Sequence, residues 1–431
     1  MPAAAPLACA RMAACFADER GFPAVVQAPY TVGDRHFSEK PGERLPAFDL
    51  PRPAFMDTEE LRMLEQAADR FLDEQATPAA SARWREEGAV DREVWRRAGE
   101  AGLLGVSIPE AYGGAGADFR FDAILIERLG LKHALNFALP LHNAVVAPYI
   151  VDYATEEQKQ RWLPDAVSGE TILAVAMSEP SAGSDLQAMR TTARRDGDHY
   201  VINGQKTFIS NGLYGNLIVL AAKTDPSAGA KGVSLFVVET EGAEGFERGR
   251  LLDKLGQEGR DTAELFFNDV RVPAENLLGG VEGRGFRMLM EKLPQERLVI
   301  AWQAMGMIEL ALKLTLDYVR ERKAFGGTLF DLQNTQFKLA ECKTKAIVAK
   351  TFLYHCTERL LERKLDAATA SMAKLFITET QASIIDECLQ LFGGYGYMLE
   401  YPIAEMYKDA RAYRIYGGAN EIMKLLIARS L

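Results

Sequence analysis

The stretch AVAMSEPSAGSD at residues 174–185, together with NGQKTFISNG at residues 203–212, is the part of the sequence that decides the fold. The first segment is an apolar run that breaks at Pro180, after which small residues would let backbone amides approach a ligand closely. In the second segment Phe208 and Ser210 are two positions apart on a predicted strand, so they share one face. An aromatic ring beside hydroxyl groups and free amides predicts a floor for a large planar cofactor with a phosphate tail. A Gly- and Ser-rich turn between two strands has the same pattern, and both interpretations stay open on these residues alone.

The periodicity of apolar residues changes on either side of this stretch. Helical spacing begins near Asp57, where Asp57 and Thr58 can cap a helix, and returns from residue 282 to the end. Between residues 172 and 273 the period is two, with a hairpin signal at Asp196-Gly197. We therefore expect an α+β multidomain protein, with a mobile N-terminal tail at residues 1–55, an α-helical domain at 56–171, an antiparallel β domain at 172–280 and a helical bundle at 281–431.

The same patterns predict the individual elements. Helices are expected over residues 59–75, 92–101, 121–129, 142–153, 155–162, 283–322, 331–363 and 367–392, the sixth of them kinked or split at Pro294. Strands are expected over residues 172–176, 190–193, 199–202, 217–224, 233–240 and 263–272.

Composition limits the possible partners. The chain has 431 residues, 48% of them apolar, and a net charge of -10. This acidic balance argues against nucleic acid, whose phosphates need a basic face. No apolar run reaches the roughly 18 residues that a membrane span requires. The N-terminus lacks the features of a signal or transit peptide. We expect a cytoplasmic protein if the source is bacterial, and a mitochondrial-matrix protein if it is eukaryotic, although no clear transit peptide is present.

Cysteine and histidine are few and scattered. No pair among the five cysteines has metal-ligand spacing with histidines nearby, and the five histidines form no cluster. We expect reduced thiols and no metal site.

Glu296 is the most unusual residue of the C-terminal region. On a helix it would share a face with apolar residues, namely Leu289, Leu293, Ile300 and Met307. A carboxylate on such a face is costly unless it is paired, protonated or used, and burial would raise its pKa towards that of a general base. Alternatively, Lys292 pairs with Glu296 at the surface. Arg297 points to another face, where it would bind a charged ligand group or a solvent-facing carboxylate.

Three later segments could contact an anionic ligand. RERKAFG at residues 320–326 ends a helix with cations, of which Arg322 either complements the helix dipole or binds a pyrophosphate. QLFGGYGY at residues 390–397 leaves a helix through glycines that form a C-cap or let a ligand lie against the backbone. IYGGANEI at residues 415–422 places two glycines before a helix N-terminus, which can bind anions and carbonyl oxygens.

Together these motifs resemble the acyl-CoA dehydrogenase family. MSEPSAGSD, NGQKTFISNG, ERKAFG with Gln333, QLFGGYGY and the terminal YGG-NEI occur in the family's order, and the resemblance covers about residues 57–431. It implies an α-helical N-terminal domain, a β middle domain and a C-terminal four-helix bundle. It also implies FAD at their junction and a homodimer or homotetramer.

The family's FAD-binding residues carry over onto both halves of the chain. One set would line the flavin and the pyrophosphate, namely Val175, Met177, Ser178, Ser184, Phe208, Ile209 and Ser210. A second set would reach FAD from the neighbouring subunit, namely Arg322, Gln333, Gln390, Gly393 and Gly394, and Phe325 of the ERKAFG segment is also implied as cofactor-binding. The helix N-terminus at Ala419, Asn420 and Glu421 would lie near the cofactor as well, with Ala419 in place of a Thr usual in the long-chain branch.

Many family members carry the catalytic Glu at the position of Gly417, where this chain has no carboxylate. The long-chain and isovaleryl members also lack it and supply the base from the helix where LPQER stands here, so the role carries over to Glu296. LPQERLVIA and YGGANEIMKLLIAR resemble the long-chain branch more closely. The substrate-binding residues that the resemblance implies are Ser184, Pro294, Gln295, Arg297, Gly417 and Gly418.

The resemblance therefore implies α,β-dehydrogenation of a fatty acyl-CoA to a trans-2-enoyl-CoA. Glu296 would remove the α-proton, the Gly417 amide would bind the thioester carbonyl, and FAD N5 would accept the β-hydrogen as hydride. Electrons would then pass to an electron transfer flavoprotein. An oxygen-using acyl-CoA oxidase or flavin monooxygenase is the alternative on the same fold, and a non-catalytic FAD-binding scaffold is the alternative from another class. The acyl chain length stays open.

Overall fold

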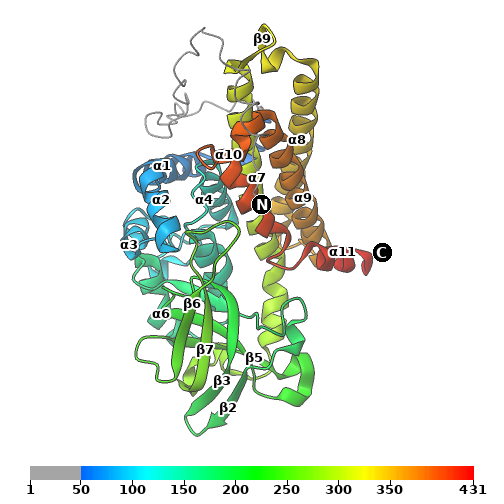
Figure 1. Ribbon diagram of the computed structural model, residues 1–431. Helices are drawn as coiled ribbons and strands as arrows, with labels where there is room; N and C mark the ends of the chain where they lie inside the picture. The colour runs from blue at the N-terminus through cyan, green and yellow to red at the C-terminus, as the bar shows by residue number, and fades with distance from the viewer. Residues whose placement is uncertain (1–49) are drawn as a thin grey trace, which may run out of the picture. The chain divides into compact units, whose positions relative to one another are not determined.

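Helices, then strands, then helices follow one another along residues 50–431, the part of the chain that the computed structural model describes (Figure 1). This order agrees with the expectation from the sequence. Most of the predicted N-terminal tail, residues 1–49, lies outside the described residues.

The N-terminal helical region begins with α1 (Glu59–Gln75), and Thr58 caps it as predicted, its hydroxyl accepting the Leu61 N–H at 3.4 Å. The helices that follow are α2 (Pro78–Glu87), α3 (Arg92–Glu100), α4 (Phe119–Leu131), α5 (Ala147–Tyr153) and α6 (Glu156–Ser168). The sequence pattern did not predict α2, because only Ala80 and Trp84 of this helix are buried and no apolar stripe marks it.

The helix expected over residues 142–153 is two elements instead of one. A π-helix (Leu141–Val146) leads directly into α5, a geometry that is rare and frequent at functional sites. His142 in the π-helix is fully buried, and its Nδ1 accepts the Leu173 N–H at 3.1 Å. Its Nε2 therefore carries the proton and donates it to the Ala166 carbonyl at 3.0 Å. Burial lowers the pKa of His142 to about 4, so a neutral imidazole holds the π-helix between α6 and the first strand.

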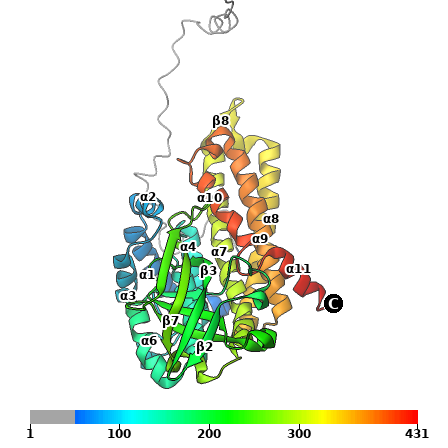
Figure 2. The same cartoon turned by 60° about the horizontal axis from the view of Figure 1, so that its bottom comes forward.

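The middle region is a seven-stranded sheet in the order β1-β4-β2-β3-β7-β6, with β5 paired to β4 (Figures 1 and 2). The strands are β1 (Leu173–Ala176), β2 (Thr192–Asp196), β3 (His199–Ser210), β4 (Leu217–Lys223), β5 (Val233–Glu239), β6 (Phe246–Leu251) and β7 (Thr262–Pro273). Most neighbours are antiparallel, but β1 runs parallel to β4, so the expected antiparallel domain is corrected to a mixed sheet. The sequence pattern missed β6, because none of its side chains is buried.

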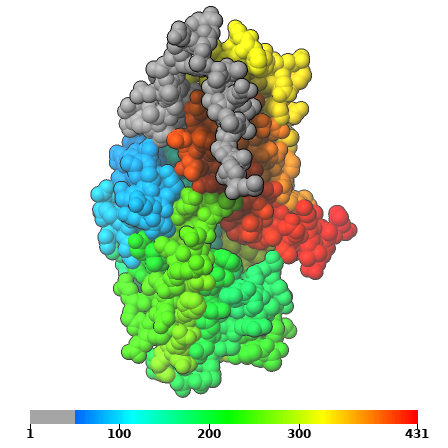
Figure 3. All heavy atoms as spheres, viewed as in Figure 1, coloured from blue at the N-terminus to red at the C-terminus, as the bar shows by residue number. Residues whose placement is uncertain are grey.

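The C-terminal helices form a bundle around α7 (Gly285–Glu321), with α8, α9 and α10 beside it in Figure 2. Their bounds are α8 (Gln333–Leu361), α9 (Ala367–Phe392), α10 (Pro402–Ala410) and α11 (Asn420–Ala428). Contrary to one predicted alternative, Pro294 does not split α7. The last helix, α11, projects from the side of the bundle in both views and in Figure 3.

By length and composition α7 is apolar enough to cross a membrane, the one such helix within residues 50–431, although the sequence suggested no such stretch. In the structure 89% of its most apolar window is buried against the rest of the protein. Such burial is typical of the core helix of a bundle. The apolar length of α7 is therefore only weak evidence for a membrane span.

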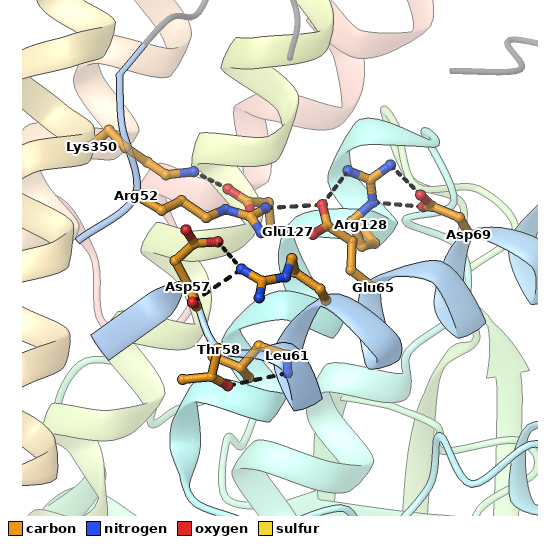
Figure 4. Close-up of polar contacts among 10 residues, drawn as sticks. Arg52, Asp57, Thr58, Leu61, Glu65, Asp69, Glu127, Arg128 and Lys350 are labelled. Atoms are coloured by element: carbon orange, nitrogen blue, oxygen red, sulfur yellow. Dashed lines mark hydrogen bonds and ion pairs between the residues drawn. The ribbon is translucent and has the colours of Figure 1, made fainter. Parts of the chain in front are cut away.

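A buried network of charges joins the N-terminal helices to the bundle (Figure 4). Lys350 on α8 pairs with Glu127 on α4, and with Glu309 on α7 at 2.7 Å. Arg52, which precedes α1 and falls in the segment expected as a tail, pairs with Glu65 at 2.6 Å and with Glu127 at 3.3 Å. Removing one partner of a buried ion pair leaves an uncompensated charge in the interior. A change at one of these residues should therefore destabilise the contact between the helical layers.

We predict that Lys350→Met destabilises the protein by about 3–5 kcal/mol, because it removes the ammonium that two buried carboxylates share. Urea denaturation followed by circular dichroism would measure the loss. The matched control is Lys338→Met on the same helix, since Lys338 pairs with Glu387 where the two side chains are 30% and 37% exposed. That control should cost only about 0–1 kcal/mol, and an equal loss in both variants would contradict the prediction.

Candidate active site

One buried ion pair fixes the loop that follows β1. Glu179 accepts a hydrogen bond from the Lys206 ammonium at 2.8 Å, and the side chain of Lys206 is fully buried. Glu179 also accepts the backbone N–H groups of Arg190 and Thr191 at 2.6 and 3.0 Å. Lys206 donates in addition to the Met177 carbonyl at 3.0 Å. The loop of the first motif is therefore held against strand β3, which carries the second motif.

The second motif presents an aromatic ring beside this loop. The Thr207 N–H donates to the Ser178 carbonyl at 3.0 Å, and the next residue, Phe208, is 69% exposed with φ of 60°. A left-handed conformation at a non-Gly residue costs about 1–3 kcal/mol and persists mainly at functional sites. Ser210 is half-buried on the same strand, whereas the side chain of Ile209 is buried in the core of the sheet. Phe208 and Ser210 thus form the exposed surface, and Ile209 could offer a ligand only its backbone.

Strand β1 is the edge of the sheet next to this surface. Its residue Val175 and the following Met177 and Ser178 are half-buried, and Ser184 on the loop is exposed. Within residues 50–431 the amides of Met177 and Ser178 donate to no acceptor. Open edge amides, hydroxyl groups and an exposed ring are what a planar cofactor with a phosphate tail requires, so the residues present fit a flavin.

Glu296 lies inside the seam between α5 and α7. It is 7% exposed, and its Oε1 accepts a hydrogen bond from the Tyr149 hydroxyl at 2.7 Å. Burial raises the pKa of Glu296 to about 7, although the hydrogen bond from Tyr149 acts in the opposite direction. The alternative pairing with Lys292 is not formed, because Lys292 pairs with Asp152. The carboxyl group therefore titrates near neutral pH, as a general base requires.

Gly417 faces α7 one turn beyond Glu296. Its φ is 62°, and a Cβ atom at this position would lie 2.0 Å from the Cδ1 of Ile300. A side chain at residue 417 would require the end of the Ile300 side chain to move and would lie on a strained left-handed backbone, so the position favours glycine. Since residues four apart share a helix face, Ile300 also brings Gly417 close to Glu296. The N–H of Gly417 donates to no acceptor in the described part of the chain, so it is available to a ligand.

Lys374 on α9 holds the loop that carries these glycines. Its ammonium is fully buried and donates to the Gly418 carbonyl at 2.9 Å and to Asn420 Oδ1 at 2.7 Å. Burial lowers the pKa of Lys374 to about 8. The Asn420 amide donates in turn to two groups of α9, Thr378 Oγ1 at 3.1 Å and Glu379 Oε1 at 2.7 Å. The side chain of Asn420 therefore points into the bundle, while Ala419 is half-buried and Glu421 is exposed.

The other predicted substrate residues on α7 point in two directions. Gln295 donates to the Ala144 carbonyl at 2.9 Å and so joins α7 to the π-helix, with Pro294 half-buried beside it. Arg297 is buried and donates to the Ala367 carbonyl at 3.2 Å, at the start of α9. It therefore lies on another face from Glu296, as the helical spacing indicated.

The second predicted cofactor set gathers at the opposite end of the bundle. A groove of about 600 Å³ there is lined by Arg322 and by residues 390–395, which include Gln390, Gly393 and Gly394. Phe325 is 92% exposed, and Gln333 is exposed at the first turn of α8. At about 1.5 Å per helical residue, Arg322 is roughly 40 Å from Glu296 along α7. Figure 1 accordingly has β9 (Gly327–Thr328) and the sheet at opposite ends of α7, so one chain does not bring the two sets together.

Three residues of the site were not predicted from the sequence, namely Tyr149, Ile300 as the neighbour of Gly417, and Lys374. Each contacts another site residue across a long sequence separation, which helical periodicity cannot predict. The position of Tyr149 directly after Pro148, within a stretch expected to be helical, was the nearest available signal.

Metal-ligating residues do not gather in the described structure. Within residues 50–431 no three His, Cys, Asp or Glu side chains are placed to hold a metal ion. Cys342, Cys356 and Cys388 are free and buried, and Cys9 and Cys15 lie outside the described residues.

Models of known protein families match almost all of the described chain. Three family models match, which are the acyl-CoA dehydrogenase N-terminal domain at residues 58–170, middle domain at 174–270 and C-terminal domain at 283–431. The mitochondrial long-chain specific acyl-CoA dehydrogenase of Mus musculus is 46% identical over 371 residues, which cover 86% of this chain and 86% of that protein.

Solved structures agree with this result. An acyl-CoA dehydrogenase from Geobacillus kaustophilus is 47% identical with a TM-score of 0.85, over 87% of this chain and 98% of that one. Butyryl-CoA dehydrogenase from Megasphaera elsdenii is 32% identical with a TM-score of 0.82, over 89% and 99% of the two chains. Apart from the mixed sheet, the fold class predicted from the sequence is confirmed, and so is the resemblance of its motifs. The chain belongs to the acyl-CoA dehydrogenase family of flavin-dependent oxidoreductases, which act on CH–CH bonds.

Proposed function

We propose that the protein binds FAD and converts a fatty acyl-CoA thioester to the trans-2-enoyl-CoA, with Glu296 as the base that removes the α-proton. The observation that carries the proposal is a carboxylate buried in the seam between α5 and α7, beside a position whose backbone conformation and close neighbour favour glycine. The similarity to a long-chain specific acyl-CoA dehydrogenase supports a long-chain acyl-CoA substrate.

The cofactor would lie on the surface made by the edge of β1 and by Phe208 and Ser210. Val175, Met177 and Ser178 would contact the ring system through their amides and side chains, and Ser184 would reach the phosphate tail. A bound flavin would supply the oxidant, accepting the β-hydrogen of the substrate as a hydride at N5 and later passing electrons to an electron transfer flavoprotein.

The chain's own residues prepare the substrate for that transfer. The free N–H of Gly417 would donate to the thioester carbonyl and stabilise the negative charge that develops there when the α-proton leaves. Glu296 would take this proton on its carboxylate, and the enclosed seam would keep water from competing for it. Pro294 and Gln295, six and five residues before Ile300 on α7, would line the path of the acyl chain beside the π-helix.

The distal groove would complete the active site of a second copy of the chain. Arg322, with its guanidinium 5.4 Å from the Tyr395 ring centroid, offers the bidentate geometry that suits a pyrophosphate. Because this groove is roughly 40 Å along α7 from Glu296, the FAD it contacts would belong to the neighbouring subunit of a dimer or tetramer.

We predict that Glu296→Gln lowers the rate of flavin reduction by about 10²–10⁴-fold, which is the usual contribution of a general base. FAD and acyl-CoA should still bind. Anaerobic stopped-flow bleaching of the flavin by an acyl-CoA would measure it. The matched control is Glu291→Gln, an exposed carboxylate five residues earlier on α7, which should reduce at the wild-type rate. Unchanged bleaching in Glu296→Gln would reject the assignment of the base.

We also predict that the wild-type reduction rate rises with pH with a midpoint near 7, because burial raises the pKa of Glu296 to about 7 and only the ionised form is a base. At one pH unit below the midpoint about one tenth of the plateau rate should remain. Single-turnover reduction measured between pH 5.5 and 9 tests this, and a rate that does not change over that range would contradict it.

Arg322→Ala should weaken FAD binding by about tenfold or more, since it removes a charge-assisted hydrogen bond, and fluorescence of released flavin would report the loss. Arg320→Ala is the control, because Arg320 lies over the Phe330 ring instead of the groove.

Co-expressed Arg322→Ala and Glu296→Gln subunits should regain activity, because a mixed dimer contains one site with both residues intact. Failure to regain it would place Arg322 in the same site as its own Glu296.

A further inference from the structure

We propose that Tyr149 is a positioning residue for this reaction, whose hydroxyl holds one oxygen of the Glu296 carboxylate so that the other oxygen is free to take the substrate's α-proton. The inference rests on the proposed function, because it concerns the same carboxylate. Its test below is separate from the test of Glu296 itself.

The two oxygens of Glu296 have different surroundings. Oε1 accepts the hydrogen bond from Tyr149 at 2.7 Å, whereas Oε2 accepts none from residues 50–431. The side chain of Tyr149 is fully buried, so its hydroxyl has no water to bond instead. One oxygen is therefore occupied by a protein donor and the other is available for a proton.

Tyr149 is itself held in place along the same seam. One turn later on α5, the Tyr153 hydroxyl donates to Glu291 at 2.8 Å, and the ring centroids of the two tyrosines are 6.3 Å apart. Between them, Asp152 pairs with Lys292. Three consecutive contacts therefore fix α5 against α7, and a fixed donor loses little entropy when it orients its acceptor.

The other charged groups near Glu296 are committed elsewhere. From α7 itself these are Lys292, which pairs with Asp152, and Arg297, which donates to the Ala367 carbonyl. The C-terminal loop contributes Gly417, which contacts Ile300 on the same face of α7 as Glu296. Neither residue has a titratable side chain. Tyr149 is thus the group from α5 that bonds the carboxylate directly, and burial raises its pKa well above the usual value, so it stays a donor.

This arrangement has a defined chemical role. When the α C–H bond breaks, its proton would bond to Oε2 of Glu296 and its electron pair would form the new C=C bond. The β-hydrogen would leave as a hydride, for which a bound flavin would be the acceptor. Before that step the hydroxyl of Tyr149 stabilises the ionised carboxylate, which burial alone would disfavour. After it, the same hydroxyl can still donate to Oε1, so the donor need not move during the reaction.

The experiment compares Tyr149→Phe with Tyr153→Phe in the FAD-loaded full-length protein. Each change removes one hydroxyl from α5, but only the first hydroxyl touches Glu296. Reduction by the acyl-CoA that bleaches the wild type fastest is measured between pH 5.5 and 9.5. Tyr149→Phe should shift the midpoint by about one pH unit or more towards alkaline pH, slow reduction about tenfold at pH 6, and approach the wild-type rate above pH 9. Tyr153→Phe should keep the wild-type midpoint, because the contacts of Tyr149 with Glu296 and of Asp152 with Lys292 still join α5 to α7.

A Tyr149→Phe profile with the wild-type midpoint would overturn the proposal, and so would a uniform loss at all pH values, which would indicate a structural role only. If this variant does not retain FAD, Tyr149→Met removes the same hydroxyl from a flexible apolar side chain and is tested in its place. Glu296→Gln separates the two hypotheses. If that variant still bleaches, the proposed base is wrong; if it does not bleach and the Tyr149 variants do not shift, only the role of Tyr149 is wrong.

Discussion

The removal of one carboxylate from water is the constraint on which the catalytic region depends. A free carboxyl group would be fully ionised at neutral pH and a weak base. In the seam between α5 and α7, burial moves the pKa of Glu296 to about 7, and the cost of this burial is limited by the hydroxyl of Tyr149. The surrounding contacts, from Gln295 to the π-helix and from Lys292 to Asp152, keep the two helices together around it.

Contacts from the sheet, the bundle and the N-terminal helices join the structure around α7, the helix that carries this carboxylate. The π-helix joins the start of β1 through His142 and joins α7 through the Ala144 carbonyl, so the edge of the sheet and the base are held by one short element. The bundle contributes the loop of Gly417, which Lys374 fixes from α9. The buried pair of Lys350 and Glu127 then ties the N-terminal helices to the same bundle. Each contact joins segments that are far apart in the sequence, which is why the site depends on the whole fold.

The sequence predicted the order of the domains and most helices because apolar spacing is strong in long amphipathic elements. It also singled out Glu296, because a charge on an apolar face is unusual whatever the tertiary structure. It missed α2 and β6, which bury few or no side chains, and it treated residues 142–153 as one helix because a π-turn has no clear signal in spacing. The parallel pairing of β1 and β4 depends on long-range topology, and Tyr149 and Lys374 act through partners that periodicity does not identify.

The left-handed backbone of Phe208 has a consequence for the stability of the protein. Phe208 lies where the pairing of β3 with β7 shifts register, between Lys206 and Ile209, and the side chain of Lys206 is fully buried. Glycine would relieve the strain at a cost in conformational entropy on folding, and it would remove the exposed ring that we propose to lie against the flavin. A bound flavin would itself stabilise the fold, so a glycine variant that held it less tightly would gain in backbone geometry and lose the stability that cofactor binding adds.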